Sequence, residues 1–138
     1  FGSQCIVAWI DVMRTDAGLQ VYSHVDGKPT GIDLAEWIAQ LEDQGAGEII
    51  LHAVHLDGAL TGFDIEMAEY SEKASVPLIL SGGAGTPEHF VPAFQDSSIS
   101  GACAGNMFTH TETAISEAKD LLNREGFAVR PLAAIQPS

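Results

Sequence analysis

The chain has 138 residues, and its six Lys or Arg against nineteen Asp or Glu give a formal net charge of −13 at pH 7. A hydrophobic fraction of 46% with only 18% charged residues is sufficient for one domain with a buried core. The chain has no basic stripe, which argues against binding to nucleic acid, and no apolar run approaches the roughly 18 residues of a membrane helix.

The cysteines and the start of the chain point to the cytoplasm. Cys5 and Cys103 each lie in an apolar run, so we expect both to be reduced and buried rather than joined in a disulfide. The start, Phe1–Gln4, lacks the basic region of a secretory signal. Because the sequence does not begin with Met, it leaves open whether the chain is a natural product or a fragment of a longer one.

The first predicted element is a strand. Cys5–Ile10 is a continuous apolar run that ends at Asp11, as in strands buried on both faces. The polar stretch Thr15–Pro29 is predicted as a long loop, with a candidate hairpin built on Leu19–Tyr22.

A helix is predicted next, from an N-cap at Thr30 to a stop at Gly45. Its apolar stripe has helical spacing and consists of Leu34, Trp37, Ile38 and Leu41. A second buried strand, Glu48–Val54, follows it.

The second half repeats this alternation of strands and helices. The predicted elements are a helix over Asp64–Lys73, a strand over Val76–Leu80, a helix over Pro87–Phe94, a strand over Ile99–Ala104, and a helix over Thr111–Glu125 that Gly126 ends. The order strand–helix, four times over, predicts an α/β fold with a parallel sheet and right-handed crossovers. A complete (β/α)8 barrel needs about 250 residues, so residues 1–138 are predicted to form a single (β/α)4 half-barrel domain, with 131–138 as a loose tail.

Polar residues follow all four predicted strands. They are Asp11, then His55–Gly58, then Ser81–Gly85, then Gly105 with Asn106. Because ligands bind at the carboxyl ends of parallel strands, we expect these residues to gather at one end of the sheet.

The glycine-rich turn Ser81–Gly85 indicates a phosphate site, since glycines let backbone N–H groups approach an anion closely. The alternative is an ordinary flexible turn. Asp11, at the end of an apolar strand, suits general acid–base work, and the alternative is a carboxylate that caps the backbone. Asp57 is equally ambiguous, because Asp-Gly pairs are common in turns.

No metal ion and no cofactor are expected. His52, His55 and Asp57 have the spacing of candidate ligands, but residues three apart on a strand point to opposite faces. Trp9 and Trp37 are predicted to be core residues.

An ordered set of motifs resembles the C-terminal half of the cyclase subunit of imidazole glycerol phosphate synthase, from histidine biosynthesis. The motifs are Phe1–Cys5, Ile10-Asp11, Thr30–Ile32, Gly45–Ile49, Asp57-Gly58, Gly62–Asp64 and Ser81–Gly85, and the likeness extends to about Arg130.

The resemblance implies a (β/α)8 barrel of two similar halves, each of which holds one phosphate of the substrate. The enzyme uses ammonia from a glutaminase partner to cyclise and cleave a phosphoribulosyl-formimino aminoimidazole carboxamide ribonucleotide. The resemblance implies that Asp11 is one of two acid–base carboxylates and that Asp57 lines the pocket. It also implies phosphate contacts at Gly58, Ser81, Gly82, Gly83, Gly105 and Asn106.

The chain departs from the family pattern at several positions. His52, His55, Ala59 and Asn106 stand where the family usually has a small hydroxyl residue, Asp, Thr and Ser respectively, and Met13 stands where a polar or basic residue is common. These departures leave room for a paralogue, such as the cyclase-like subunit of another amidotransferase pathway. The sister isomerase of the pathway fits the motifs less well.

A half barrel would expose two strand edges and the apolar face of a barrel interior, so a homodimer that completes the barrel is predicted. Two function classes remain open: a lyase-type cyclase, and a half barrel that binds phosphate or docks a glutaminase without turnover.

Overall fold

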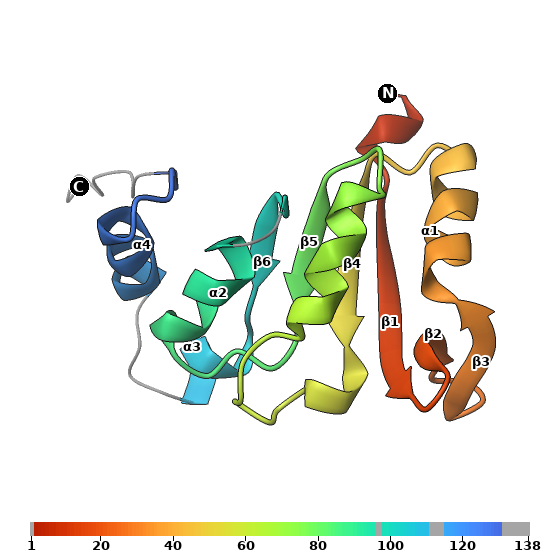
Figure 1. Cartoon of the computed structure of the whole chain (residues 1–138), viewed down its shortest axis with the longest axis horizontal. Coiled ribbons are helices and arrows are strands. Elements are labelled where there is room, and N and C mark those ends of the chain that lie inside the picture. Colours follow the sequence, from red (N-terminus) through yellow and green to blue (C-terminus); the bar gives the residue numbers. More distant parts are fainter. Residues whose placement is uncertain (1, 96–97, 111–114, 131–138) are drawn as a thin grey trace, which may run out of the picture.

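The computed structural model describes residues 2–95, 98–110 and 115–130. Its six strands form one sheet in the order β3-β2-β1-β4-β5-β6 (Figure 1). The strands are β1 (Val7–Thr15), β2 (Gly18–Ser23), β3 (Lys28–Asp33), β4 (Glu48–Ala53), β5 (Leu78–Ser81) and β6 (Gly101–Cys103). The α-helices are α1 (Leu34–Asp43), α2 (Phe90–Gln95), α3 (Asn106–His110) and α4 (Ile115–Arg124). Four 3₁₀ helices, η1 (Ser3–Cys5), η2 (Val54–Leu56), η3 (Ile65–Glu72) and η4 (Pro87–His89), complete the elements.

The predicted α/β class and half-barrel arrangement are confirmed. Strands β1, β4, β5 and β6 run parallel to one another and correspond to the four predicted strands. The sheet is open, with β3 and β6 at its two edges.

The predicted end of the first strand at Asp11 is wrong. β1 continues to Thr15 because its last four residues pair antiparallel with β2, from Val12 opposite Val21 to Thr15 opposite Gly18. The proposed hairpin on Leu19–Tyr22 is present and includes β3, so a hairpin interrupts the strand–helix alternation in the first unit.

Helix α1 is capped by Asp33, not by Thr30. Oδ1 of Asp33 accepts hydrogen bonds from the backbone N–H groups of Ala35 (2.9 Å) and Glu36 (3.1 Å). The Thr30 hydroxyl instead donates to a carbonyl of β2 at 2.9 Å, because Thr30 belongs to the hairpin. Gly45 follows the helix at a φ of 90°, as the predicted stop requires.

The later helices are shorter than predicted. The Asp64–Lys73 segment forms η3, and Pro87–His89 is 3₁₀, so the α-helical part begins at Phe90. Pro92 is accommodated because it lies in the first turn of α2, where its missing N–H costs no helical hydrogen bond. The predicted start of the last helix at Thr111 and the tail 131–138 lie outside the described residues.

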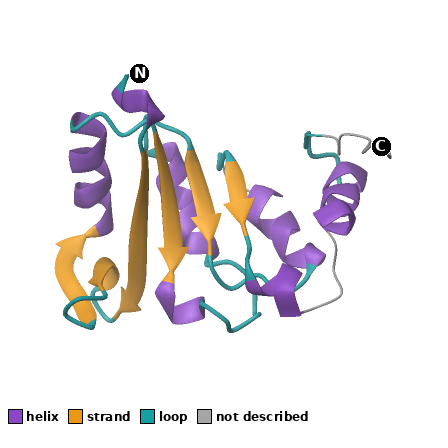
Figure 2. Ribbon diagram, turned by 180° about the vertical axis from the view of Figure 1, so that it is seen from behind, coloured by secondary structure: helices purple, strands orange, loops and turns teal. Residues whose placement is uncertain are grey.

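The helices cover one face of the sheet, and the described part of the chain leaves the opposite face bare (Figure 1 and Figure 2). Figure 2 views the sheet from its bare face, so β1, β4 and β5 lie in front and the sheet hides part of the helices behind it. Alternate strand residues such as Ile10, Leu51 and Leu80 are buried beneath the helices. Trp9 points to the bare face and is 52% exposed, so its prediction as a core residue is wrong.

Cys5 and Cys103 are both exposed free thiols, contrary to the prediction that they are buried. Cys5 lies in η1 before the sheet begins, and Cys103 ends the edge strand β6, so neither has a second layer to cover it. Within the described ranges, none of the helices is sufficiently long and apolar to span a bilayer.

Candidate functional site

A cavity of about 220 Å³ lies at the carboxyl ends of β4, β5 and β6. Its lining includes every residue predicted for contact with the substrate or its phosphate: Asp57, Gly58, Ser81, Gly82, Gly83, Gly105 and Asn106. The parallel strands all end at this side, so loops distant in the sequence meet here. Trp9, His52 and Cys103 also line the cavity.

Strand register aligns four polar side chains into one row. Asp11 on β1 is the register partner of His52 on β4, His52 is the partner of Ser81 on β5, and Ser81 is the partner of Cys103 on β6. We call these four residues the polar row. Since side chains alternate along a strand, the row faces the bare side of the sheet together with Trp9, two residues before Asp11.

The glycine turn is fixed in place by its neighbours. Gly82 and Gly83 have φ values of 94° and 91°, which favour glycine. A Cβ on Gly83 would lie 2.1 Å from the carbonyl oxygen of Gly62, whose N–H donates to the Gly83 carbonyl at 2.8 Å. The turn after β5 is therefore tied to the loop that follows η2.

His52 lies inside the cavity between two polar partners. Its Nδ1 is 3.2 Å from the hydroxyl oxygen of Ser81, and its Nε2 is 4.0 Å from Oδ2 of Asp57. The indole of Trp9 lies on another side, with ring centroids 5.4 Å apart. The sequence suggested His52 as a candidate metal ligand and as a departure from the family pattern, but not as a cavity residue. The register of β4 against β5 places it in the cavity, and that register is a property of the folded sheet.

Asp11 adjoins the cavity without lining it. Its Oδ1 accepts a hydrogen bond from the indole N–H of Trp9 at 3.1 Å, and its Oδ2 lies 3.1 Å from Nε2 of His24 on the turn of the hairpin. The side chain of Asp11 is 24% exposed, so it remains open to solvent on the bare face. Both oxygens of the carboxylate therefore have a defined partner.

His55 belongs to a separate polar cluster. Its Nε2 lies 2.9 Å from the buried carboxylate of Asp64, which also accepts two hydrogen bonds from Arg14 at 2.6 and 2.7 Å. Arg14 also pairs with Glu66. These hydrogen bonds, above all those to Asp64, raise the pKa of Arg14. Asp64 belongs to the motif Gly62–Asp64 but was not predicted as a site residue, because its partner Arg14 lies fifty residues away in the sequence.

β4 ends at Ala53, between His52 and His55, so the alternation of side chains along a strand does not determine how these two residues lie. They nevertheless face different groups. The part of the chain that the structure describes contains no group of three or more His, Cys, Asp or Glu side chains arranged to hold a metal ion.

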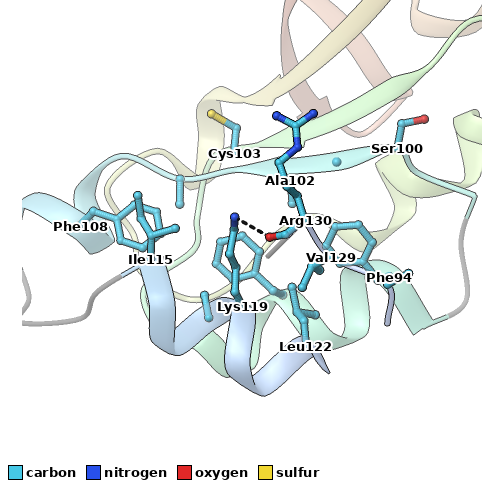
Figure 3. A pocket seen from close by; sticks show the side chains of 15 residues that line it. Phe94, Ser100, Ala102, Cys103, Phe108, Ile115, Lys119, Leu122, Val129 and Arg130 are labelled. Atoms are coloured by element: carbon cyan, nitrogen blue, oxygen red, sulfur yellow. Dashed lines mark hydrogen bonds between the residues drawn. The ribbon is translucent and has the colours of Figure 1, made fainter. Parts of the chain in front are cut away.

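A larger cavity of about 460 Å³ lies between β6 and α4 (Figure 3). Its lining is largely apolar, with Phe94, Phe108 and Leu122, and Lys119 Nζ at its side donates to the carbonyl of Arg130 at 2.8 Å. None of the predicted site residues lines it. The smaller polar cavity is therefore the candidate functional site.

Comparison with known proteins identifies the family. A family model described as "Histidine biosynthesis protein" matches residues 1–114. Imidazole glycerol phosphate synthase subunit HisF of Dehalococcoides mccartyi is 41% identical over 131 residues, which cover 94% of this chain and 52% of that protein. The same subunit of Thermobifida fusca is 42% identical over 137 residues, and that of Halalkalibacterium halodurans is 42% identical over 133, each match covering 94% of this chain and 53% of the relative. The chain thus spans about half the length of these relatives, and it belongs to the histidine biosynthesis protein family.

Proposed function

We propose that the chain supplies half of the cyclase barrel of imidazole glycerol phosphate synthase. In this role it binds one phosphate of the ribonucleotide substrate and contributes one acid–base carboxylate, Asp11. The observation that carries the proposal is the cavity that joins the glycine turn, Gly58 and Asn106 beside the polar row. The glycines in its lining let backbone N–H groups approach a phosphate group closely.

The proposed chemistry divides between two groups. Backbone N–H groups of the glycine turn and the amide of Asn106 hold the phosphate, and Gly58 lines the cavity beside that amide. Asp11 moves protons as ammonia enters, the imidazole ring closes and the aminoimidazole carboxamide ribotide leaves. The hydrogen bond from Trp9 holds its carboxylate on the open face of the sheet.

A second half barrel is required to enclose this chemistry. Strand β1 pairs with β2 from Val12 onward, so its earlier residues present a free edge on that side, and β6 ends the sheet with another. We propose that a second copy of the chain covers the bare face and pairs with both edges, and that a glutaminase subunit delivers ammonia to the completed barrel.

The test is turnover of the phosphoribulosyl-formimino ribonucleotide with ammonia as the nitrogen source. We expect measurable formation of imidazole glycerol phosphate by the unmodified chain and a loss of about a hundredfold or more in Asp11→Asn, as removal of an acid–base group costs. Asp43→Asn, at the exposed end of α1, is the matched control and should retain full activity. An active Asp11→Asn variant would remove Asp11 from its proposed role.

A second candidate function is phosphate binding without turnover. Both oxygens of Asp11 are already engaged, by Trp9 and by His24, which favours a structural role for this carboxylate. Binding of inorganic phosphate at the glycine turn by a chain that shows no turnover would support this second function.

A further inference from the structure

The candidate site contains one side chain that can carry positive charge. Among the described residues that line the cavity there is no Lys or Arg, and His52 is the lining residue that can become a cation. The chain as a whole has a net charge of −13, and Asp57 adds a carboxylate at the cavity itself. A dianion that enters this cavity therefore depends on backbone amides, neutral side chains and His52.

The surroundings of His52 determine how its imidazole is used. Asp57 Oδ2 lies 4.0 Å from Nε2, which favours a proton on that nitrogen, so in the neutral ring Nδ1 accepts a hydrogen bond from the Ser81 hydroxyl. When the ring gains a proton, Nδ1 becomes a donor to Ser81, whose hydroxyl hydrogen is then free to point elsewhere. One protonation thus adds a positive charge and releases a hydroxyl donor into the same cavity.

Among the described residues, three other titratable groups lie near His52. Asp57 faces it from the loop after η2, Asp11 is its register neighbour on β1, and Cys103 lines the cavity from β6, whereas β5 presents the neutral Ser81. The ring packs against Trp9 on one side, with ring centroids 5.4 Å apart, and Nδ1 lies 3.2 Å from the hydroxyl oxygen of Ser81.

We propose that His52 and Ser81 form a proton-linked pair that binds the dianionic phosphate group of the ligand, so that affinity for the anion rises when His52 is protonated. The proposal rests on the proposed function, since it assumes that this cavity is the phosphate site. It assigns to the pair the charge that the cavity otherwise lacks, because hydrogen bonds from a charged donor are roughly twice as strong as those from a neutral one.

The test measures binding of sulfate and of inorganic phosphate by calorimetry at about pH 6 and about pH 8, a range in which imidazole changes charge. Sulfate is the decisive probe, since it remains a dianion at both values and isolates the titration of the protein. We expect the unmodified chain to bind sulfate about tenfold more tightly at the lower pH. His52→Gln keeps a side-chain N–H but cannot become a cation, and it should lose this difference although it retains the other four histidines.

A pair of matched variants tests the role of Asp57. Asp57→Asn and Glu69→Gln each remove one negative charge, but Glu69 is exposed on η3 and does not line the cavity. We expect Asp57→Asn to strengthen sulfate binding several-fold and Glu69→Gln to change it little, because only the first charge lies beside His52.

The outcomes separate the two proposals. If the unmodified chain binds neither anion at either pH, the phosphate site itself fails, and this inference fails with it. If it binds both and His52→Gln shows the same pH dependence, the phosphate site stands and the role of His52 is overturned.

Should His52→Gln not fold, ¹⁵N NMR of the unmodified chain decides. Sulfate added at constant pH should shift one histidine ring toward its protonated form together with the Gly82 and Gly83 amides, and the absence of that shift would contradict the proposal.

Discussion

Gly83 is the position at which the candidate site is least tolerant of change. Its positive φ is strained for any other residue, and a Cβ would overlap the carbonyl of Gly62 at 2.1 Å. The Gly62 N–H that donates to Gly83 would have to move with it. The turn after β5 therefore depends on this one glycine for its conformation and for its attachment to the neighbouring loop.

We predict that Gly83→Ala lowers the free energy of unfolding by about 2 kcal/mol or more, since it combines backbone strain with a steric clash. Gly105→Ala is the matched control, because a Cβ on Gly105 would meet no atom within 4 Å and its φ is not among the positive ones. Urea denaturation followed by circular dichroism measures both. Equal stability of the two variants would show that the turn is free to rearrange.

The polar residues of the site were largely predictable from the sequence, because glycines and Asp-Gly pairs that follow apolar runs mark the carboxyl ends of strands. Trp9 and His52 were not placed correctly. Both lie within apolar runs, which predict burial, and only the absence of a layer over one face turns them into cavity residues. The local sequence shows whether a residue is apolar and whether it lies in an alternating pattern. It does not show whether a second layer of the fold covers that residue.

At the scale of the elements, the cap of α1 shows a similar limit. Thr30 and Asp33 are both good N-cap residues, and the sequence around them does not separate the two. The hairpin does, because it extends β3 to Asp33 and engages the Thr30 hydroxyl with a carbonyl of β2. The helix therefore begins at the first residue that cross-strand pairing leaves free.

Asp33→Ala should destabilise the chain by about 1 kcal/mol, the usual cost of losing an N-cap side chain. Asp43→Ala, at the opposite end of the same helix, removes the same charge without removing a cap, and we expect no loss of stability from it. Thermal unfolding of the two variants side by side distinguishes them, and a destabilisation of similar size in both would point to charge rather than capping.

Tyr70 on η3 is partly buried and lies among carboxylates. Burial raises the pKa of Tyr70, and the carboxylates of Asp33, Glu69 and Glu66 act in the same direction. The folded state therefore holds the Tyr70 proton more tightly than the unfolded state does. The resulting stability is complete below the ordinary tyrosine pKa of about 10 and is lost as the pH rises through the folded value.

Tyr70→Phe cannot ionise, and we predict that its urea midpoint falls less than that of the unmodified chain between about pH 9 and about pH 11. The same comparison between about pH 6 and pH 8 serves as the control, since neither protein changes its charge at position 70 in that range. Parallel losses in the alkaline range would contradict the assignment.

At the scale of the whole molecule, the dominant feature is a sheet whose helices, among the described residues, lie on one face (Figure 1 and Figure 2). Predicting parallel strands required only the alternation of apolar runs with helical stripes. The extent of the hairpin was less accessible, because β2 and β3 are polar edge strands whose pairing replaces the missing apolar pattern. One face of the sheet is bare because the long helices that the structure describes all pack on the opposite face.

We predict that the chain is a dimer at micromolar concentration, with twice the chain mass of 14.6 kDa by light scattering. Ile79→Glu introduces a charge on the bare face of β5 and should shift the mass to that of the monomer, because a buried unpaired carboxylate is costly. Val25→Glu is the control at the hairpin turn, where the side chain is 98% exposed, and should remain dimeric. A monomeric mass for the unmodified chain would contradict the pairing of two half barrels.

The polar row constrains how this protein can diverge. Its four members come from four separate strands and share one face only through matched register and a two-residue repeat. A single-residue insertion within β4 before His52 would rotate that imidazole beneath the helices, whereas insertions in the connecting loops leave the alignment untouched. Insertions and deletions that arise as this sequence evolves should therefore occur mainly in the loops between the strands and rarely within the strands.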